Sequence, residues 1–284
     1  MTRIGPLESA PLAFRKMHGL GNDFVVIDQR THPVPLTPPL VRAIGDRHRG
    51  VGFDQLAEIW PCETAAAEIR FWNSDGSTAG ACGNATRCIA DLLMGELSSD
   101  ALDLITANGR LAATRQGEGL ISVDMGPVHL DWQEIPLARA ADTAALPLPG
   151  SPGAVSVGNP HCVLFIDDLD AVDLAIDGPQ WEHHQMFPER TNVEFCKILA
   201  PDRIRVRVWE RGGMITQACG SGACAVVVAA VRRGLTGRKV EVLLDGGTLQ
   251  IEWRESDGHV VMTGPVAAVF EGTLPPEFIL AATQ

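Results

Sequence analysis

Two stretches of the sequence, ACGNATRCIADLLM at residues 81–94 and ACGSGACAVVVAAV at residues 218–231, share one pattern. In each, a cysteine is followed by Gly and then by Asn or Ser, and a run that can form a helix begins directly afterwards. The pattern predicts helices over residues 85–94 and 222–231. A strand, a turn and a helix in this order place Cys82 and Cys219 beside backbone N–H groups that lack partners. The partial positive charge there favours a thiolate and can also hold a carboxylate.

The two stretches belong to an internal repeat, because Cys82 and Cys219 lie 137 residues apart and other positions share that offset. The further pairs are Asn22 and Asn159, Gln55 and Asn192, and Trp72 and Trp209. A repeat this long predicts two similar domains. Each consists mostly of strands with turn signals and one helix, so the fold class is α+β. Two such domains facing each other create a cleft with pseudo-two-fold symmetry.

Shorter patterns complete the prediction. Residues 24–27 and 68–72 are predicted strands, and Asn108-Gly109 predicts a hairpin turn. The Pro-, Ala- and Gly-rich stretch 137–153 predicts a linker or loop that divides the chain almost in half. We expect a first domain of residues 12–127 together with 267–284, a second domain of residues 128–266, and a loose extension over residues 1–11.

Composition narrows the classes of function. The 23 Lys and Arg residues are outnumbered by 35 Asp and Glu, and a net charge of −12 argues against a nucleic-acid partner because such a surface repels phosphate. The longest apolar run, residues 223–231, is half the length of a membrane span, so no membrane partner is expected. The start of the chain has no apolar secretory segment, and the seven cysteines do not form a disulfide framework. We therefore expect reduced thiols in the cytoplasm.

Two thiols, one in each half, suit stereoinversion at a carbon next to a carboxylate. One group removes the α-proton from one face and the other delivers a proton to the opposite face. A carboxylate held by two helix starts stabilises the charge that develops on the carbon. Dithiol redox chemistry would use a close CxxC pair, which the sequence lacks, and zinc would need further ligands at short spacing. Because the sequence also lacks a pyridoxal phosphate lysine motif, a GxGxxG motif and a P-loop, we expect neither a cofactor nor a metal.

At these residues the chain resembles the diaminopimelate epimerases, cofactor-independent enzymes of bacterial lysine and cell-wall precursor synthesis. Together the matching stretches are highly specific, and they span residues 16 to 225. They are KMHGLGNDFVVID (16–28), GFDQL (52–56), FWNSDGS (71–77), ACGNATRC (81–88), GNPHCV (158–163), TNVEF (191–195), WERG (209–212) and ACGSGACA (218–225).

The resemblance implies interconversion of LL- and meso-diaminopimelate with Cys82 and Cys219 as the two bases. It implies a homodimer and two domains, each a barrel-like, mostly antiparallel sheet around a central helix, with the active site in the cleft between them. Side-chain amides that bind substrate in the family are matched by Asn22, Gln55, Asn73, Asn159 and Asn192. Gly83-Asn84 and Gly220-Ser221 match the helix starts that receive the α-carboxylate in the family. Glu210-Arg211 match the pair that recognises the distal end of the substrate. His161 and Glu210 match the residues that adjust the pKa of the thiols.

The chemistry of these side chains agrees with those roles, since Arg211 offers a planar fork to a distal carboxylate and Glu210 an anion to an ammonium. The chain also departs from the family pattern. The departures are Ala85-Thr86 after the first motif, Met214-Ile215 before the second, Ser221 for Thr, and Trp209 and Phe270 where Tyr is common. The position of Phe270 is linked in the family to dimer contacts.

Two other functions remain open from the sequence. The first is a racemase or epimerase of the same superfamily that acts on proline, hydroxyproline or histidine. Such an enzyme would share the two cysteines but would need no clamp for a second charged end. The second is a binding protein for a small zwitterion, in which the thiols are structural and no proton exchange occurs at the α-carbon.

Overall fold

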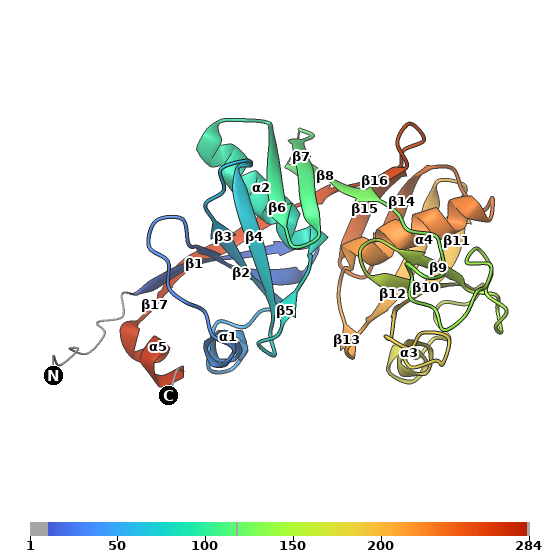
Figure 1. The fold of residues 1–284 in the computed structure, drawn as a ribbon, viewed down its shortest axis with the longest axis horizontal. Helices are drawn as coiled ribbons and strands as arrows, with labels where there is room; N and C mark the ends of the chain where they lie inside the picture. The colour runs from blue at the N-terminus through green and yellow to red at the C-terminus, as the bar shows by residue number, and fades with distance from the viewer. Residues whose placement is uncertain (1–10, 118, 283–284) are drawn as a thin grey trace.

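The computed structural model describes residues 11–117 and 119–282. The expected extension over residues 1–11 falls almost entirely outside this part of the chain. Figure 1 shows two lobes of similar construction side by side, each with one long helix enclosed by strands. The first half of the chain contains β1 (Leu12–Gly19), β2 (Asn22–Asp28), α1 (Pro38–Gly45), β3 (Gln55–Trp60), β4 (Ala67–Asn73), β5 (Thr78–Ala79), α2 (Gly83–Leu97), β6 (Ala101–Thr106), β7 (Gly109–Arg115) and β8 (Leu120–Pro127).

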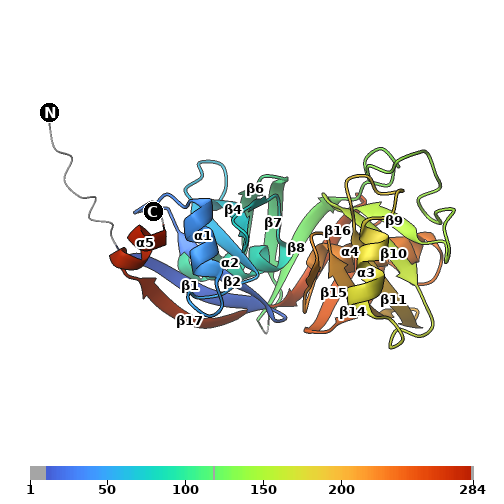
Figure 2. The same cartoon turned by 90° about the horizontal axis from the view of Figure 1, so that it is seen from below.

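The second half repeats this order and then returns to the first lobe. Its elements are β9 (Gly153–Ser156), β10 (Pro160–Phe165), α3 (Leu174–Glu182), β11 (Asn192–Ala200), β12 (Arg203–Glu210), β13 (Met214–Ile215), α4 (Gly220–Arg232), β14 (Lys239–Leu244), β15 (Gly247–Trp253), β16 (His259–Pro265), β17 (Ala267–Leu274) and α5 (Pro276–Ala282). Figure 2 shows β17 running back beside β1, with which it pairs.

The strands form one continuous ladder. Its order is β17-β1-β2-β3-β4-β6-β7-β8-β16-β15-β14-β12-β11-β10-β9, with β5 added to β4 and β13 to β12. Most pairs are antiparallel, as predicted. In the part of the chain that the structure describes, β8 does not pair with β17 and β16 does not pair with β9. Each half is therefore a curved, open sheet wrapped around a helix, and neither closes into a barrel.

The pairing register confirms the repeat. The parallel pair β2–β3 aligns Phe24 with Gln55, and the parallel pair β10–β11 aligns His161 with Asn192, both 137 residues further along. The strands β8 and β16, which hold equivalent places in the two halves, pair with each other and join the lobes.

The predicted helices are present and extend beyond their predicted ends, as α2 and α4. Both lie in the hydrophobic core of their lobe, where the enclosing strands exclude water. Ten residues of α4 are buried, so this helix is apolar on almost every side, the pattern of a helix surrounded by its own protein. Valine is a weak helix former, and burial of these side chains within the sheet offsets that weakness.

The local predictions are largely confirmed. The predicted strands lie within β2 and β4, and Asn108-Gly109 joins β6 to β7. The stretch 137–153 is a loop up to the start of β9, but it is not a linker between domains, because Leu137 and Leu146 are buried in the core of the second lobe.

Among the described residues, the structure has no helix long and apolar enough to cross a membrane.

The two lobes touch closely at the turn between β14 and β15. A Cβ added to Gly246 would lie 1.8 Å from the carbonyl oxygen of Leu20, which belongs to the β1–β2 turn of the other half. The backbone of one lobe therefore packs directly against the backbone of the other, and only a residue without a side chain permits this approach.

We predict that Gly246→Ala lowers the free energy of unfolding by about 2 kcal/mol, because the backbone of Leu20 must move to make room. Thermal unfolding followed by circular dichroism measures this loss. Gly95→Ala in α2 is the matched control, since nothing lies within 4 Å of a Cβ added there, and it is expected to be neutral or slightly stabilising. Equal melting temperatures for Gly246→Ala and the wild type would contradict the close packing.

Candidate active site

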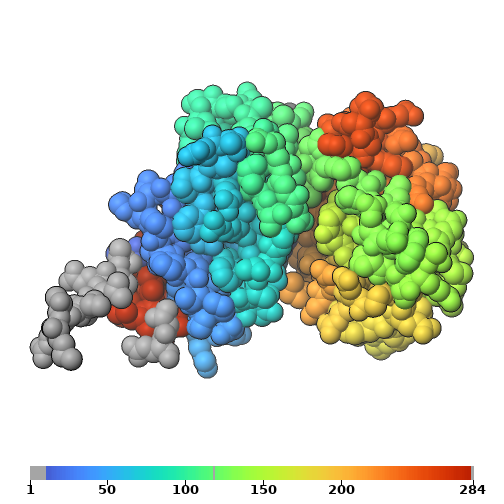
Figure 3. Space-filling view, viewed as in Figure 1, coloured from blue at the N-terminus to red at the C-terminus, as the bar shows by residue number. Residues whose placement is uncertain are grey.

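A cavity of about 620 Å³ lies between the two halves and is lined by residues from both. Figure 3 shows the surface recessed where the lobes meet. Every substrate-binding residue predicted from the sequence lines this cavity, together with both cysteines. These residues are Asn22, Gln55, Asn73, Cys82, Gly83, Asn84, Asn159, Asn192, Glu210, Arg211, Cys219, Gly220 and Ser221. His161 is fully buried behind the wall and does not line it.

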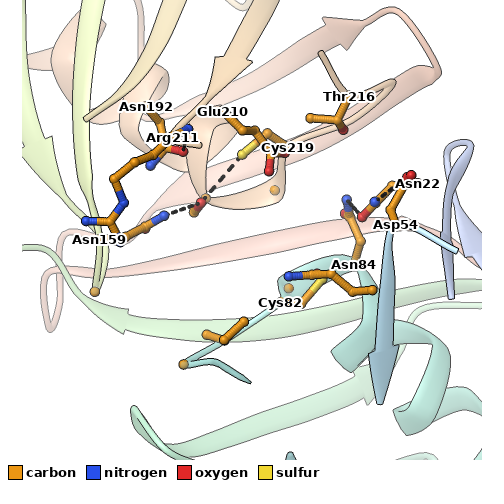
Figure 4. A pocket seen from close by; sticks show the side chains of 18 of the residues that line it. Asn22, Asp54, Cys82, Asn84, Asn159, Asn192, Glu210, Arg211, Thr216 and Cys219 are labelled. Carbon is orange, nitrogen blue, oxygen red and sulfur yellow. Dashed lines mark hydrogen bonds between the residues drawn. The ribbon is translucent and has the colours of Figure 1, made fainter. Parts of the chain in front are cut away.

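The two cysteines are the N-cap residues of α2 and α4. The sulfur of Cys82 accepts a hydrogen bond from the N–H of Ala85 at 3.4 Å, and that of Cys219 accepts one from the N–H of Gly222, also at 3.4 Å. Thiols thus occupy the position where Ser, Thr, Asp or Asn usually accept from the first turn. Figure 4 shows Cys82 and Cys219 coming from opposite lobes, and both line the same cavity rather than separate crevices.

Burial decides the charge state of both thiols. The N–H contacts at the helix starts lower the pKa of each thiol, as the sequence predicts, but burial outweighs them. Burial raises the pKa of Cys82 to about 12 and holds the pKa of Cys219 well above its ordinary value. In this conformation both cysteines are therefore neutral at pH 7, and a thiolate needs compensating positive charge to form.

The starts of α2 and α4 converge on one methionine. A Cβ on Gly83 would lie 2.6 Å from the Cε atom of Met262, and one on Gly220 would lie 2.8 Å from its Sδ atom. The glycine after each cysteine leaves room for the flexible end of Met262, which a side chain there would displace. This contact brings the two helix starts, with their free N–H groups, to one region of the cavity.

In the first lobe, three polar side chains form a chain along the cavity (Figure 4). Asn84 donates from Nδ2 to the Oδ1 atom of Asn22 at 3.1 Å, and Asn22 donates to Asp54 at 2.9 Å. Asn84 also donates to the carbonyl oxygen of Ala218 in the other lobe at 2.8 Å, so this amide links the halves. Nearby, Gln55 donates to Asn73 at 3.1 Å.

In the second lobe, His161 and its neighbours set the position of a cavity amide. The Nδ1 atom of His161 lies 2.7 Å from an oxygen of Glu194, and its Nε2 atom lies 3.0 Å from the Oδ1 atom of Asn159. Asn159 in turn donates to the hydroxyl of Ser221 at 3.4 Å. Both ring nitrogens are thus engaged, and the imidazole holds Asn159 rather than a thiol in this conformation.

Asn192, Glu210 and Arg211 form the outer wall of the same lobe. The N–H of Arg211 donates to the Oδ1 atom of Asn192 at 3.0 Å, while the Arg211 side chain is exposed at the mouth of the cavity. The carboxyl of Glu210 contacts the Cys219 thiol and the Thr216 hydroxyl, which lower its pKa, but burial prevails and raises that pKa to about 7.

Sequence reasoning missed several residues of the wall, among them Asp54 and Asn108. Asp54 precedes Gln55 in the GFDQL stretch, which was a usable signal, and it is held by Arg47 at 2.7 Å. Asn108 carried only a turn signal, yet its side chain lies 2.8 Å from the place of a Cβ on Gly80 and 2.9 Å from that on Gly158. The hairpin turn between β6 and β7 therefore also forms part of the cavity.

One cluster of titratable groups outside the cavity has ligand-like spacing, formed by Asp124, Asp257 and His259. Arg254 pairs with Asp124 and, at 2.7 Å, with Asp257, while His259 lies 2.9 Å from Asp124. These acids already have a cationic partner, so the cluster is accounted for as an ion-pair network.

With this geometry in place, the comparisons with known proteins decide the family. A family model described as diaminopimelate epimerase matches residues 14–130 and 153–269, one match in each lobe. The chain belongs to the diaminopimelate epimerase family. It is 55% identical to the diaminopimelate epimerase of Rhodospirillum centenum over 92% of this chain and 91% of that one. It is 54% identical to that of Phenylobacterium zucineum over 92% and 97% of the two chains.

Solved structures with low sequence identity share the fold. A Bacillus anthracis phenazine biosynthesis protein of the PhzF family aligns with a TM-score of 0.68 at 14% identity, covering 94% of this chain and 99% of that one. A hydroxyproline epimerase from Agrobacterium vitis aligns with a TM-score of 0.66 at 15% identity, covering 93% and 92%. The arrangement of two lobes around a cleft is therefore common to several groups of proteins.

The departures of this epimerase-family chain from the family pattern fit the structure. Thr86 donates from its hydroxyl to the carbonyl oxygen of Cys82 at 2.8 Å. The first turn of α2 therefore forms with Ala85 at the position where the family pattern has a second Gly. Trp209 donates to the buried Glu182 at 2.7 Å. Met214 and Ile215 form the short strand β13 and are exposed at the mouth of the cavity.

We predict that Glu210 makes stability depend on pH. The pKa of Glu210 is about 7 in the folded state and is ordinarily 4.5. Its contribution to the free energy of unfolding is therefore fully present below pH 4.5 and is lost as the pH rises through 7. Between pH 5 and pH 8 the wild type should therefore lose about 2 kcal/mol more of its free energy of unfolding than Glu210→Gln. Urea unfolding at the two pH values measures the difference, and parallel losses in both proteins would rule out the raised pKa.

Proposed function

We propose that this protein inverts the α-carbon of LL-2,6-diaminopimelate to give meso-diaminopimelate, with Cys82 and Cys219 as the acid–base pair and without a cofactor. The observation that carries the proposal is that two cysteines, each capping a helix of a different lobe, line one cavity. A carbon held between them has one sulfur on each face. The product belongs to lysine and peptidoglycan precursor synthesis, and we propose the cytoplasm as its location.

The reaction needs one thiolate and one thiol. The thiolate removes the α-proton and becomes a thiol, leaving an electron pair on the carbon, and the opposite thiol gives its proton to the other face and becomes a thiolate. The next turnover can run in the reverse direction with the roles exchanged. The N–H groups at the starts of α2 and α4, after Gly83-Asn84 and Gly220-Ser221, hold the α-carboxylate and stabilise the charge that develops.

The distal end of the substrate is assigned to the polar wall of the cavity. Arg211, exposed at the mouth, offers a two-pronged donor to the distal carboxylate. Glu210 offers an anion to an ammonium group, and the amides of Asn73, Asn159 and Asn192 can donate or accept. A racemase of proline, hydroxyproline or histidine would not need this second set of charged and polar groups.

Replacing either cysteine should slow turnover strongly. We predict that Cys82→Ser or Cys219→Ser lowers the rate of epimerisation by about 10²–10⁴-fold, because a hydroxyl is a far weaker acid than a thiol. Cys62→Ser is the control, since Cys62 is a thiol on a loop outside the cavity, and it should retain wild-type activity. Circular dichroism checks that each variant is folded. Wild-type turnover by either of the first two variants would refute the assignment.

Solvent deuterium distinguishes an enzyme from a binding protein. The proposed mechanism places deuterium from D₂O at the α-carbon during turnover, which NMR or mass spectrometry detects. A protein that only binds a small zwitterion would leave that position protonated.

The choice of substrate is tested at Arg211. We predict that Arg211→Lys raises KM for LL-diaminopimelate about tenfold, because an ammonium cannot replace the planar fork. Arg190→Lys, an exposed arginine outside the cavity, should leave KM unchanged. A panel containing proline, hydroxyproline and histidine is assayed in parallel. Turnover of one of these with no turnover of diaminopimelate would favour the alternative racemase.

We also propose how the chain is organised. Pairing of β17 with β1, and contacts of α5 with α1, support a first domain of residues 12–127 with 267–284 and a second of residues 128–266. A homodimer is supported by the outer edge of β17, where Val269 and Phe270 are 55% and 49% exposed. Within the described ranges this edge of β17 pairs with no other strand, and an open edge with apolar side chains beside it favours pairing with a second copy. Sedimentation equilibrium distinguishes such a dimer from a 30.4 kDa monomer.

A further inference from the structure

One buried charge in the protein has no place in the mechanism above. Arg87, in the second turn of α2, is completely buried and is the largest side chain with no exposure among the residues that the structure describes. Its Nη1 atom donates to the Sδ atom of Met262 at 3.1 Å, while Nε and Nη2 have no hydrogen-bond partner among the described residues. An arginine cannot lose its proton in a protein, so this is a real positive charge. Burying it without a partner is costly and calls for an explanation.

The position of Arg87 places this charge directly behind the cavity. A Cβ on Gly19 would lie 3.0 Å from its Nη2 atom, and one on Gly264 would lie 3.3 Å from its Cζ atom. The partner Met262 is the same side chain that separates the glycines at the starts of α2 and α4. The guanidinium is therefore one side chain away from both helix starts, where the N–H groups already concentrate positive potential.

The charged and titratable groups around the two sulfurs differ. The ionisable groups that interact with Arg87 are all thiols, those of Cys82 and Cys88 on α2 and Cys224 on α4. Cys82 lies near the carboxyl of Glu210 on β12, which raises its pKa, and near Arg87 in the adjoining helix, which lowers it. Cys219 lies near two carboxyls, those of Glu210 on β12 and Glu194 on β11, and Glu194 is in turn held by His161.

The internal repeat shows that this difference is built into the sequence. Arg87 corresponds to Cys224, 137 residues further along, and Glu194 corresponds to Ala57. The first half thus has a cation, Arg87, near its proposed catalytic thiol and has Ala57 at the position equivalent to Glu194. The second half has Cys224 at the position equivalent to Arg87 and has the carboxyl of Glu194.

We propose that Arg87 is a positioning residue of this epimerase, whose buried charge makes Cys82 the thiol that ionises first and strengthens the hold on the substrate α-carboxylate. This inference rests on the proposed function for its meaning in catalysis. The proton of Cys82 leaves to solvent, and the thiolate becomes the counter-ion that the guanidinium lacks. Cys219, which lies near the two carboxyls, retains its proton and is the acid when turnover begins. Arg87 acts through Met262 and the start of α2, without touching the substrate.

The experiment measures the ionisation of each thiol directly. Iodoacetamide alkylates the thiolate, forming a carbon–sulfur bond and releasing iodide, and mass spectrometry follows each cysteine separately across a range of pH. The same cysteine is compared between variants, so differences in access cancel. Arg87→Met, which removes the charge but keeps the length, should slow alkylation of Cys82 about tenfold at a fixed pH, which corresponds to one pKa unit. Arg87→Gln also removes the charge and should slow alkylation to the same extent, because the effect follows the charge and not the shape of the side chain.

Two controls accompany these variants. Cys62, outside the cavity, is an internal reference whose alkylation should be the same in all proteins. Arg232→Met removes a part-buried arginine at the other end of α4 and should leave the Cys82 profile unchanged. If Arg87→Met fails to fold, Arg87→Gln provides the same comparison with the wild type.

Two results would overturn the proposal. An unchanged Cys82 profile in Arg87→Met would show that the charge does not reach the thiol. A wild-type Cys82 profile in Arg87→Gln, together with a slowed one in Arg87→Met, would show that Arg87 acts by packing alone. Alkylation requires no substrate, so failure to turn over diaminopimelate would refute the proposed function while leaving this measurement intact.

Discussion

The start of a helix leaves backbone N–H groups without partners, and this constraint organises the whole molecule. Cys82 and Cys219 occupy that position in α2 and α4, and each accepts a hydrogen bond from the first turn. The sheets wrap the two helices so that their starts meet at Met262, where glycine permits contact. The cavity, its anion-binding potential and its two thiols all follow from where these helices begin.

The environment of the thiols opposes the chemistry that their position suggests. N–H groups favour a thiolate, but burial outweighs them and raises the pKa of both cysteines. Exclusion of water strengthens the electrostatic stabilisation of charge that develops on the substrate carbon, and the same exclusion penalises the charged base. Cys82 has the buried guanidinium of Arg87 and the carboxyl of Glu210 as charged neighbours, whereas Cys219 has the carboxyls of Glu210 and Glu194, so the cost of forming a thiolate differs between the two sulfurs.

Much of the fold and the cavity is predictable from the sequence, because both depend on local patterns repeated at one offset. The repeat predicts two lobes, the Cys-Gly motifs predict both helix starts, and the matched amides predict part of the wall. What local patterns do not predict is contact between distant segments. Asn108 is a turn former that becomes part of the cavity only because the β6–β7 hairpin reaches Gly80 and Gly158. Closure of each barrel likewise depends on long-range pairing, and the sheets remain open.

Two further features depend on contacts between distant segments and are not predictable from local sequence: the absence of hydrogen-bond partners for Nε and Nη2 of Arg87 among the described residues, and the burial of part of the loop 137–153. An arginine five residues past a cysteine gives no sign in the sequence that its guanidinium will lie between two glycines and a methionine. A Pro- and Ala-rich segment is typical of a connection, and only the packing of Leu137 and Leu146 makes it part of the core. Tertiary contacts decide both cases.

The pairing of β8 with β16 has a consequence for the origin of the protein. The two strands are equivalent in the repeat and run antiparallel, which is the arrangement that a two-fold axis creates between identical chains. An ancestral chain of half this length that dimerised through that strand would present two identical sulfurs. The two-fold symmetry would give both sulfurs identical surroundings. Gene fusion lifts that symmetry, and the two copies can then evolve one side of the cleft toward giving up a proton and the other toward keeping it.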